Sequence, residues 1–166
     1  MKNHQIRVFR KLLRVFERLT AQQLKEESCC QGVTLAQCHT ILEIEELGQA
    51  TSGVLSKQLG LDKSTLSRTV DGLVNIGLIE RVPNPTDRRY NLLSLTVKGQ
   101  EIADRINRSN DKCYQQVFSG IAEESQVEVL VNFELLVRAM RKFQDHKSKG
   151  VEGKMPPQRL KDTKGI

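Results

Sequence analysis

Residues 52–77 read SGVLSKQLGLDKSTLSRTVDGLVNIG. The stretch predicts two short helices, Ser52–Leu59 and Asp62–Ile76, each followed at once by a glycine. Gly60 is the residue type that most readily ends a helix in a left-handed conformation. Asp62 is a good N-cap because its carboxylate can accept hydrogen bonds from the first free amides of the second helix. Helix, glycine-containing turn and helix form the pattern of a helix-turn-helix.

The second of these helices presents one apolar and one polar face. Leu66, Val70 and Leu73 recur at helical spacing and are expected to pack inward. Small hydroxyl side chains and an arginine on the other side would let the helix enter a major groove about 12 Å wide. On an isolated helix, such a face would more simply be solvated surface. Its position in a helix-turn-helix favours DNA contacts, which we predict for Lys63, Ser64, Thr65, Ser67 and Arg68.

The chain changes character after this helix. Residues 78–82 and 90–95 are predicted strands, and the proline-rich segment between them predicts a hairpin with a projecting tip. Arg88 and Arg89 lie at this tip, where an arginine could enter a narrow minor groove. Asp87 would be repelled by phosphate, so we expect it to hold an arginine in place and to support the hairpin.

Helices are also predicted on both sides of this region. Thr34 and Thr96 are suitable N-caps for two of them. The apolar faces of the outer helices are too wide for one small core, which predicts a homodimer. The first helix also carries cations around its apolar face: Arg7, Arg10, Lys11, Arg14 and Arg18. The predicted ranges are residues 4–25, residues 34–47, residues 96–119 and residues 123–147.

These elements predict a mainly α fold with a small β-hairpin wing, in which a winged helix-turn-helix is joined to a helical dimerisation region. We assign residues 1–33 to an N-terminal dimerisation helix and junction, and residues 34–96 to the DNA-binding domain. Residues 97–147 form the C-terminal dimerisation helices. Residues 148–166 form a basic tail, which we expect to be disordered because it contains glycines and prolines and almost no apolar periodicity.

Composition narrows the class of protein. The chain has 166 residues and a formal net charge of +6, which alone is weak support for a nucleic-acid partner. No apolar run approaches the roughly 18 residues that a membrane helix needs, so we expect a soluble protein with no membrane partner. The basic N-terminus has no uninterrupted apolar stretch of the kind found in secretory signals. We therefore expect a cytoplasmic protein with reduced cysteines.

Residues 87–96, Asp-Arg-Arg-Tyr-Asn-Leu-Leu-Ser-Leu-Thr, resemble the wing signature of the MarR family (multiple antibiotic resistance regulators) at every defined position. Residues 55–59, 64–68 and 73–81 are also similar to its helix-turn-helix and strand entry. The resemblance covers about residues 5–146. It implies a homodimer on a pseudopalindromic DNA site, with a ligand or sensing site between the dimerising and DNA-binding parts. It also implies that Ser64, Thr65, Ser67 and Arg68 face the major groove and Arg89 the minor groove, with Asp87 supporting it.

The cysteines indicate what such a protein could sense. Cys29, Cys30 and Cys38, with His39 beside them, could converge near the junction of the first two helices. Thiolates suit a soft metal or trivalent arsenic, Cys and His suit zinc, and a thiol of lowered pKa suits a peroxide sensor. Free cysteine is also among the most buried residue types, which we expect for Cys113. A small-molecule effector is equally open, and no resident cofactor is predicted.

Function follows from these features. The sequence contains no phosphate-binding glycine loop, metalloprotease histidine pair or CxxC motif, so we do not expect an enzyme. It predicts a sequence-specific transcriptional regulator, acting as a repressor that is released by an effector or by thiol modification. The alternatives are a nonspecific architectural DNA-binding protein and a winged module that binds only protein.

Overall fold

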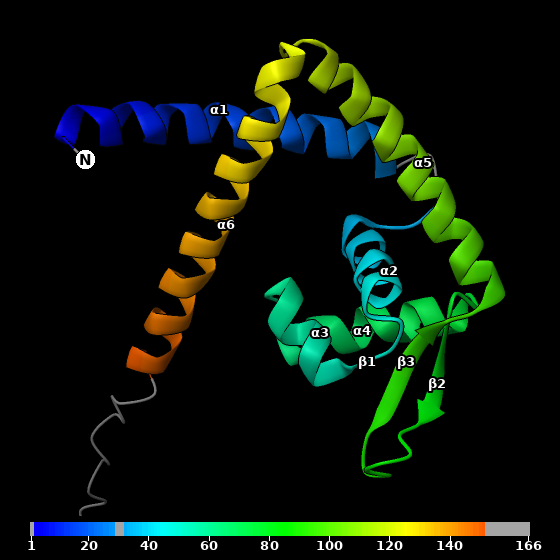
Figure 1. Cartoon of the computed structure of the whole chain (residues 1–166). Coiled ribbons are helices and arrows are strands. Elements are labelled where there is room, and N and C mark those ends of the chain that lie inside the picture. Colours follow the sequence, from blue (N-terminus) through cyan, green and yellow to red (C-terminus); the bar gives the residue numbers. More distant parts are fainter. Residues whose placement is uncertain (1, 29–31, 152–166) are drawn as a thin grey trace, which may run out of the picture. The chain divides into compact units, whose positions relative to one another are not determined.

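The computed structural model describes residues 2–28 and 32–151, which fall into two compact units (Figure 1). The first unit ends at Cys113 and the second begins at Tyr114, so the division lies inside a long helix. No helix in the described part of the chain is both long and apolar enough to cross a bilayer. The elements are α1 (Asn3–Ser28), α2 (Leu35–Leu47), β1 (Ala50–Thr51), α3 (Ser52–Leu59), α4 (Lys63–Asn75), β2 (Ile79–Pro83), β3 (Asn91–Leu95), α5 (Val97–Ser119) and α6 (Glu123–Val151).

The core of the first unit lies among α2, α3, α4 and the sheet. Helix α4 buries the apolar face predicted for it, since Leu66, Val70 and Leu73 are almost fully enclosed. Leu55 of α3 and Leu93 of β3 are equally buried, so helix-turn-helix and sheet share one core. Burying such side chains is the main favourable contribution to folding. The winged helix-turn-helix fold predicted from the sequence is confirmed.

The sheet has three antiparallel strands in the order β1-β3-β2. Strands β2 and β3 form the predicted hairpin, with Ile79 opposite Leu95 and Pro83 opposite Asn91. Strand β1 was not predicted: its two residues pair with Leu92 and Leu93 of β3. Two residues are too few to show the alternation that identifies a strand in a sequence. The strand matters because it attaches the start of α3 to the wing.

Local capping explains where the helices begin. The hydroxyl of Thr34 accepts a hydrogen bond from the Gln37 amide, and the Gln37 side chain accepts one from the Thr34 amide, which is a capping box. Thr96 caps α5 in part by accepting a hydrogen bond from the Gly99 amide at 3.0 Å. Gly60 follows α3 with φ of +63°, in the left-handed region. These three predictions from the sequence are confirmed.

A tight joint connects the end of α4 to the start of α5. The Thr96 hydroxyl donates to the Gly77 carbonyl at 2.7 Å, and the Thr96 amide donates to the Leu78 carbonyl at 3.1 Å. The Lys98 ammonium donates to the Ile76 carbonyl at 3.2 Å. A Cβ atom on Gly99 would lie 2.0 Å from the Leu78 carbonyl oxygen, so only glycine allows this approach. The joint fixes the position of α4 relative to α5.

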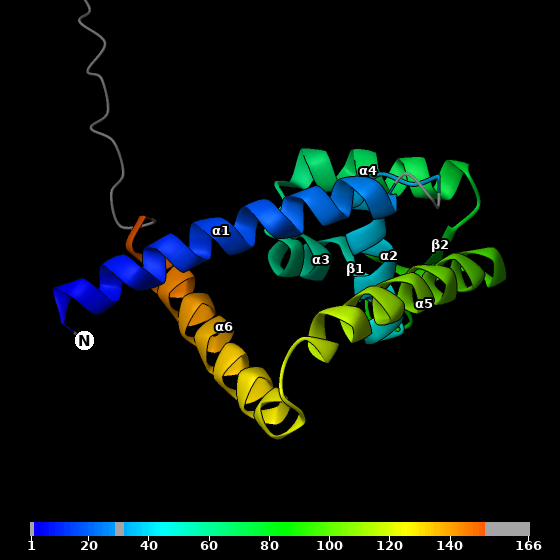
Figure 2. The ribbon, with the colours of Figure 1, turned by 90° about the horizontal axis from the view of Figure 1, so that it is seen from above.

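Helix α2 lies between α4 and the first part of α5 (Figure 2). The Glu45 carboxylate of α2 accepts hydrogen bonds from the side-chain amides of Gln100 and Asn107, both at 2.8 Å. Ile102 and Ile106 bury the intervening face of α5. Polar and apolar contacts together therefore hold the first part of α5 against the lobe formed by α2, α3, α4 and the sheet.

Helix α1 matches its prediction but ends three residues later. Its apolar side chains are largely uncovered: Leu12 is 61% exposed and Leu19 is 62% exposed. This apolar surface is what a helix leaves when its covering partner is another chain.

The second unit contains the end of α5 and all of α6. The Gln126 side chain donates to the carbonyls of Phe118 and Ile121, both at 3.1 Å, and so fixes the turn between the helices. Helix α6 extends to Val151, four residues beyond its predicted end, so residues 148–151 are helical and the tail boundary placed there was wrong. The rest of the tail, residues 152–166, lies outside the described residues.

Candidate nucleic-acid interface

The first turn of α4 carries several of the predicted DNA contacts. Asp62 caps the helix: its carboxylate accepts hydrogen bonds from the Thr65 amide at 2.9 Å and from the hydroxyls of Ser64 and Thr65, both at 2.6 Å. These bonds, the Ser64 hydroxyl first, hold the pKa of Asp62 well below its usual range. The two hydroxyls are thus already donating within the protein. In a contact with DNA, each hydroxyl oxygen can accept a hydrogen bond through its lone pairs. To donate one, the hydroxyl must first break its hydrogen bond to Asp62.

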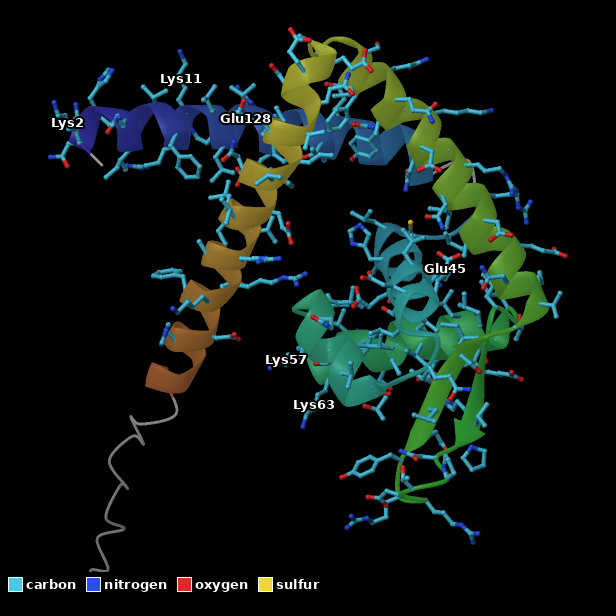
Figure 3. The ribbon with its side chains drawn as sticks, in the orientation of Figure 1. Lys2, Lys11, Glu45, Lys57, Lys63 and Glu128 are labelled. Carbon is cyan, nitrogen blue, oxygen red and sulfur yellow. The ribbon has the colours of Figure 1, made fainter. Side chains whose placement is uncertain are left out.

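The remaining predicted residues of α4 are open to solvent. Lys63, Ser67 and Arg68 are exposed, whereas Thr65 is half-buried. The labelled side chain of Lys63 projects outward from the lobe (Figure 3). Arginine and hydroxyl groups on an exposed helix face can donate to base edges and to phosphates.

An ion pair that the sequence did not indicate joins α4 to the wing. The Arg81 guanidinium of β2 lies 2.5 Å from the Asp71 carboxylate of α4, and both side chains are about half exposed. The Ser67 hydroxyl donates to the same carboxylate at 3.4 Å. Asp71 lies on α4, and its partner is ten residues further along the chain, across a turn. Only the folded hairpin brings the two together.

The tip of the wing contains the second group of cations. Two nitrogens of the Arg89 side chain donate to the two Asp87 oxygens at 3.0 and 2.8 Å, and the Arg89 amide donates at 3.1 Å. Arg89 thereby lowers the pKa of Asp87, and Asp87 raises the pKa of Arg89. The Arg89 side chain is still 81% exposed, while its guanidinium also lies 5.9 Å from the ring centroid of Tyr90. This is the contact expected of Asp87, and Arg88 is exposed beside it.

Helix α4, the start of α3 and the wing enclose a cleft of about 510 Å³. Its cations come from separate elements: Lys63 from α4, Arg81 from β2 and Arg89 from the wing tip. Arg81 and Arg89 are paired with Asp71 and Asp87, whereas Lys63 makes no ion pair among the described residues. Lys63 thus adds unpaired positive charge, which favours anionic groups such as phosphate. The other lining residues are Thr51, Ser52, Gly53, Leu66, Ser67, Val70, Tyr90, Asn91 and Leu93.

The predicted sensing residues are placed only in part. Cys38 is half-buried against the core and His39 is exposed, whereas Cys29 and Cys30 lie outside the described residues. The described residues contain no group of three metal-ligating side chains. Cys113 is half-buried instead of fully enclosed, because the buried part of α5 ends at Ile106. Its sulfur accepts a hydrogen bond from the Gln23 side-chain amide.

The chain is similar to known proteins in both sequence and structure. A family model described as the MarR family matches residues 31–89. The multiple antibiotic resistance protein MarR of Escherichia coli K12 is 34% identical over 92 residues, which span 55% of this chain and 59% of that protein. The matched segment is therefore less than two thirds of that relative.

Solved structures extend the likeness over more of the chain. A mutant of Escherichia coli MarR complexed with operator DNA superposes with a TM-score of 0.65, at 25% identity, over 82% of this chain and 95% of that chain. A MarR family protein from Bacillus stearothermophilus shares the fold, with a TM-score of 0.72 over 87% of this chain and 99% of that chain, at 23% identity. The helix-turn-helix, the hairpin wing and the matched segment thus make this chain similar to MarR family proteins.

Proposed function

We propose that the chain is a transcriptional regulator that binds a pseudopalindromic operator as a homodimer and represses until an effector or a thiol modification releases it. The observation that carries this proposal is the cleft lined jointly by α4 and the wing, with Lys63, Ser67 and Arg89 on its walls. The Escherichia coli relative with a similar fold was solved with operator DNA, which supports the same partner for this chain.

Each element has a distinct task in the proposed complex. Helix α4 lies in the major groove, where Arg68 reads base edges and Lys63 contacts phosphate. The wing follows the backbone, and Arg89 enters the minor groove. Asp87 holds the guanidinium through two hydrogen bonds, so less side-chain freedom is lost on binding.

A homodimer would supply the second half of the interface. The exposed apolar residues of α1 and of α6 are the surfaces we assign to it, with Leu135 and Phe143 of α6 being 58% and 68% exposed. Two copies related by a twofold axis would read half-sites about 34–36 Å apart, one helical turn of DNA.

Fluorescence anisotropy with DNA from the chain's own upstream region tests this proposal. Replacing Arg68 or Arg89 by Ala should weaken operator binding by about 10- to 100-fold, because each removes a charged contact to base or phosphate. Arg105→Ala removes an exposed arginine of α5 and is the matched control. If all three variants bind the operator with the same affinity as the wild type, the assignment of Arg68 and Arg89 to the DNA-binding face is wrong.

The same measurement separates a regulator from an architectural protein. A regulator should prefer its operator over unrelated duplex by about 10³-fold or more. An architectural protein would bind both with one affinity and one salt dependence.

Thiol sensing is tested with the reduced protein on operator DNA, titrated with arsenite, zinc or a peroxide. We expect one reagent to release the wild type but not Cys38→Ser, while Cys113→Ser responds as the wild type does. If DNA stays bound throughout, the cysteines only pack, and an organic effector becomes the candidate.

A further inference from the structure

A continuous stripe of cations runs along α1 outside the interface described above. Arg7, Lys11, Arg14 and Arg18 follow one another at intervals of four, three and four residues, which places them on one face of the helix. All four are exposed, and none makes an ion pair or hydrogen bond with any described residue. The stripe is therefore uncompensated positive charge.

The stripe faces away from the apolar surface of the same helix. At 100° per residue, its centre lies about 160° from the centre of the apolar band that includes Leu12 and Phe16. If a second copy of the chain covers the apolar band, the cations remain open. The labelled side chain of Lys11 projects from α1 on the side away from the lobe, whereas Lys57 and Lys63 lie on the lobe's opposite side (Figure 3).

We infer that this stripe is a second nucleic-acid surface, which binds the backbone of a DNA duplex other than the operator segment held by α4 and the wing. Residues 7–18 of the helix extend about 16 Å. One DNA strand places a phosphate every 3.4 Å of helix axis, so the stripe spans about five phosphates. Three of the four cations are arginines, whose planar guanidinium groups match phosphate geometry.

Duplex DNA fits this surface better than a membrane does. An interfacial helix binds lipid through its apolar face together with its cations. In the dimer proposed here the apolar face is buried, which leaves only the phosphate-binding charge. With two copies of the stripe, one dimer on an operator would hold a second duplex without reading its sequence.

A two-layer capture experiment tests the inference. Operator duplex is immobilised and saturated with protein, and a labelled duplex without the operator is then added. Wild type should capture the second duplex. A variant carrying Arg7→Gln, Lys11→Gln, Arg14→Gln and Arg18→Gln should capture about ten-fold less while still binding the first layer. The slope of second-layer affinity against salt should also fall by about 0.9 for each phosphate that the variant no longer neutralises.

The control variant removes the same charge elsewhere, through Arg105→Gln, Arg108→Gln, Lys112→Gln and Arg141→Gln, and should capture as the wild type does. A two-site variant, Arg14→Gln with Arg18→Gln, gives an intermediate loss and serves if the fourfold variant does not fold. Undiminished capture by the stripe variants overturns the inference. So does binding of wild type to phosphatidylglycerol vesicles without capture of DNA. Failure of the wild type to form the first layer would instead count against the proposed function.

Discussion

Asp62 shows how one side chain can serve both the fold and the proposed interface. Its carboxylate accepts three hydrogen bonds from Ser64 and Thr65, two residues also predicted to face DNA. An N-cap of this kind satisfies amides that the helix itself leaves unpaired. The geometry of the first turn of α4, which is predicted to face DNA, therefore depends on the ionised form of Asp62.

Asp62 makes stability depend on pH. Its folded pKa lies below the unfolded value of about 3.9, so its contribution is complete at neutral pH and is lost as the pH falls below about 4 toward the folded pKa. We expect Asp62→Asn to be less stable than wild type at pH 7 in urea denaturation. The difference should shrink on acidification. Asp111→Asn on α5 controls for the change of charge, and a difference that stays constant between pH values of about 7 and 3 would contradict the assignment.

Individual residues of the interface were predictable to different degrees. The caps and the exposed face of α4 follow from local spacing, and Asp87 was paired with an arginine from charge alone. The Asp71–Arg81 contact could not be predicted, because it depends on how the wing packs against α4. The engagement of the Ser64 and Thr65 hydroxyls by Asp62 was also missed: both were expected to point toward DNA. The DNA contacts themselves stay predictions.

At the scale of elements, most boundaries follow from the sequence. Thr34 and Thr96 mark the starts of α2 and α5, and Gly60 marks the end of α3. Helix α4 ends one residue before its predicted end. The two-residue strand β1 was missed because its pairing with β3 is nonlocal. Burial was expected for Cys113 of α5. Burial stops at Ile106, and Val117 is 52% exposed, because only the first part of α5 packs on the lobe.

The crossing of α5 over the turn after α4 should tolerate no side chain. In Gly99→Ala the added methyl group meets the Leu78 carbonyl at 2.0 Å, and overpacking of this kind costs about 1–3 kcal/mol. Chemical denaturation measures the loss of stability. Gly53→Ala in α3 is the matched control, because its nearest neighbour would be 3.9 Å away and alanine favours helix. Equal stability of the two variants would show that the joint yields easily.

At the scale of the whole molecule, the central prediction is a dimer built from the outer helices. Replacing Leu12 and Leu19 by Glu places charges on the apolar band of α1, and burying them in an interface is strongly unfavourable. Sedimentation should show a shift toward monomer, with weaker operator binding. Val97→Glu, at a position 82% exposed on α5, should leave the mass unchanged. A double variant that remains dimeric would place the contact elsewhere.

The joint between α4 and α5 has a consequence for how this protein could change its target. Thr96 and Lys98 bind the turn after α4 through main-chain carbonyls, those of Ile76, Gly77 and Leu78. Every peptide unit offers such a carbonyl, so these bonds are indifferent to the side chains on the outer face of α4. Positions such as Ser67 and Arg68 can thus be rewritten, by evolution or by design, while the helix keeps its place. The hydrogen bonds that position α4 are therefore independent of the side chains that are predicted to contact DNA.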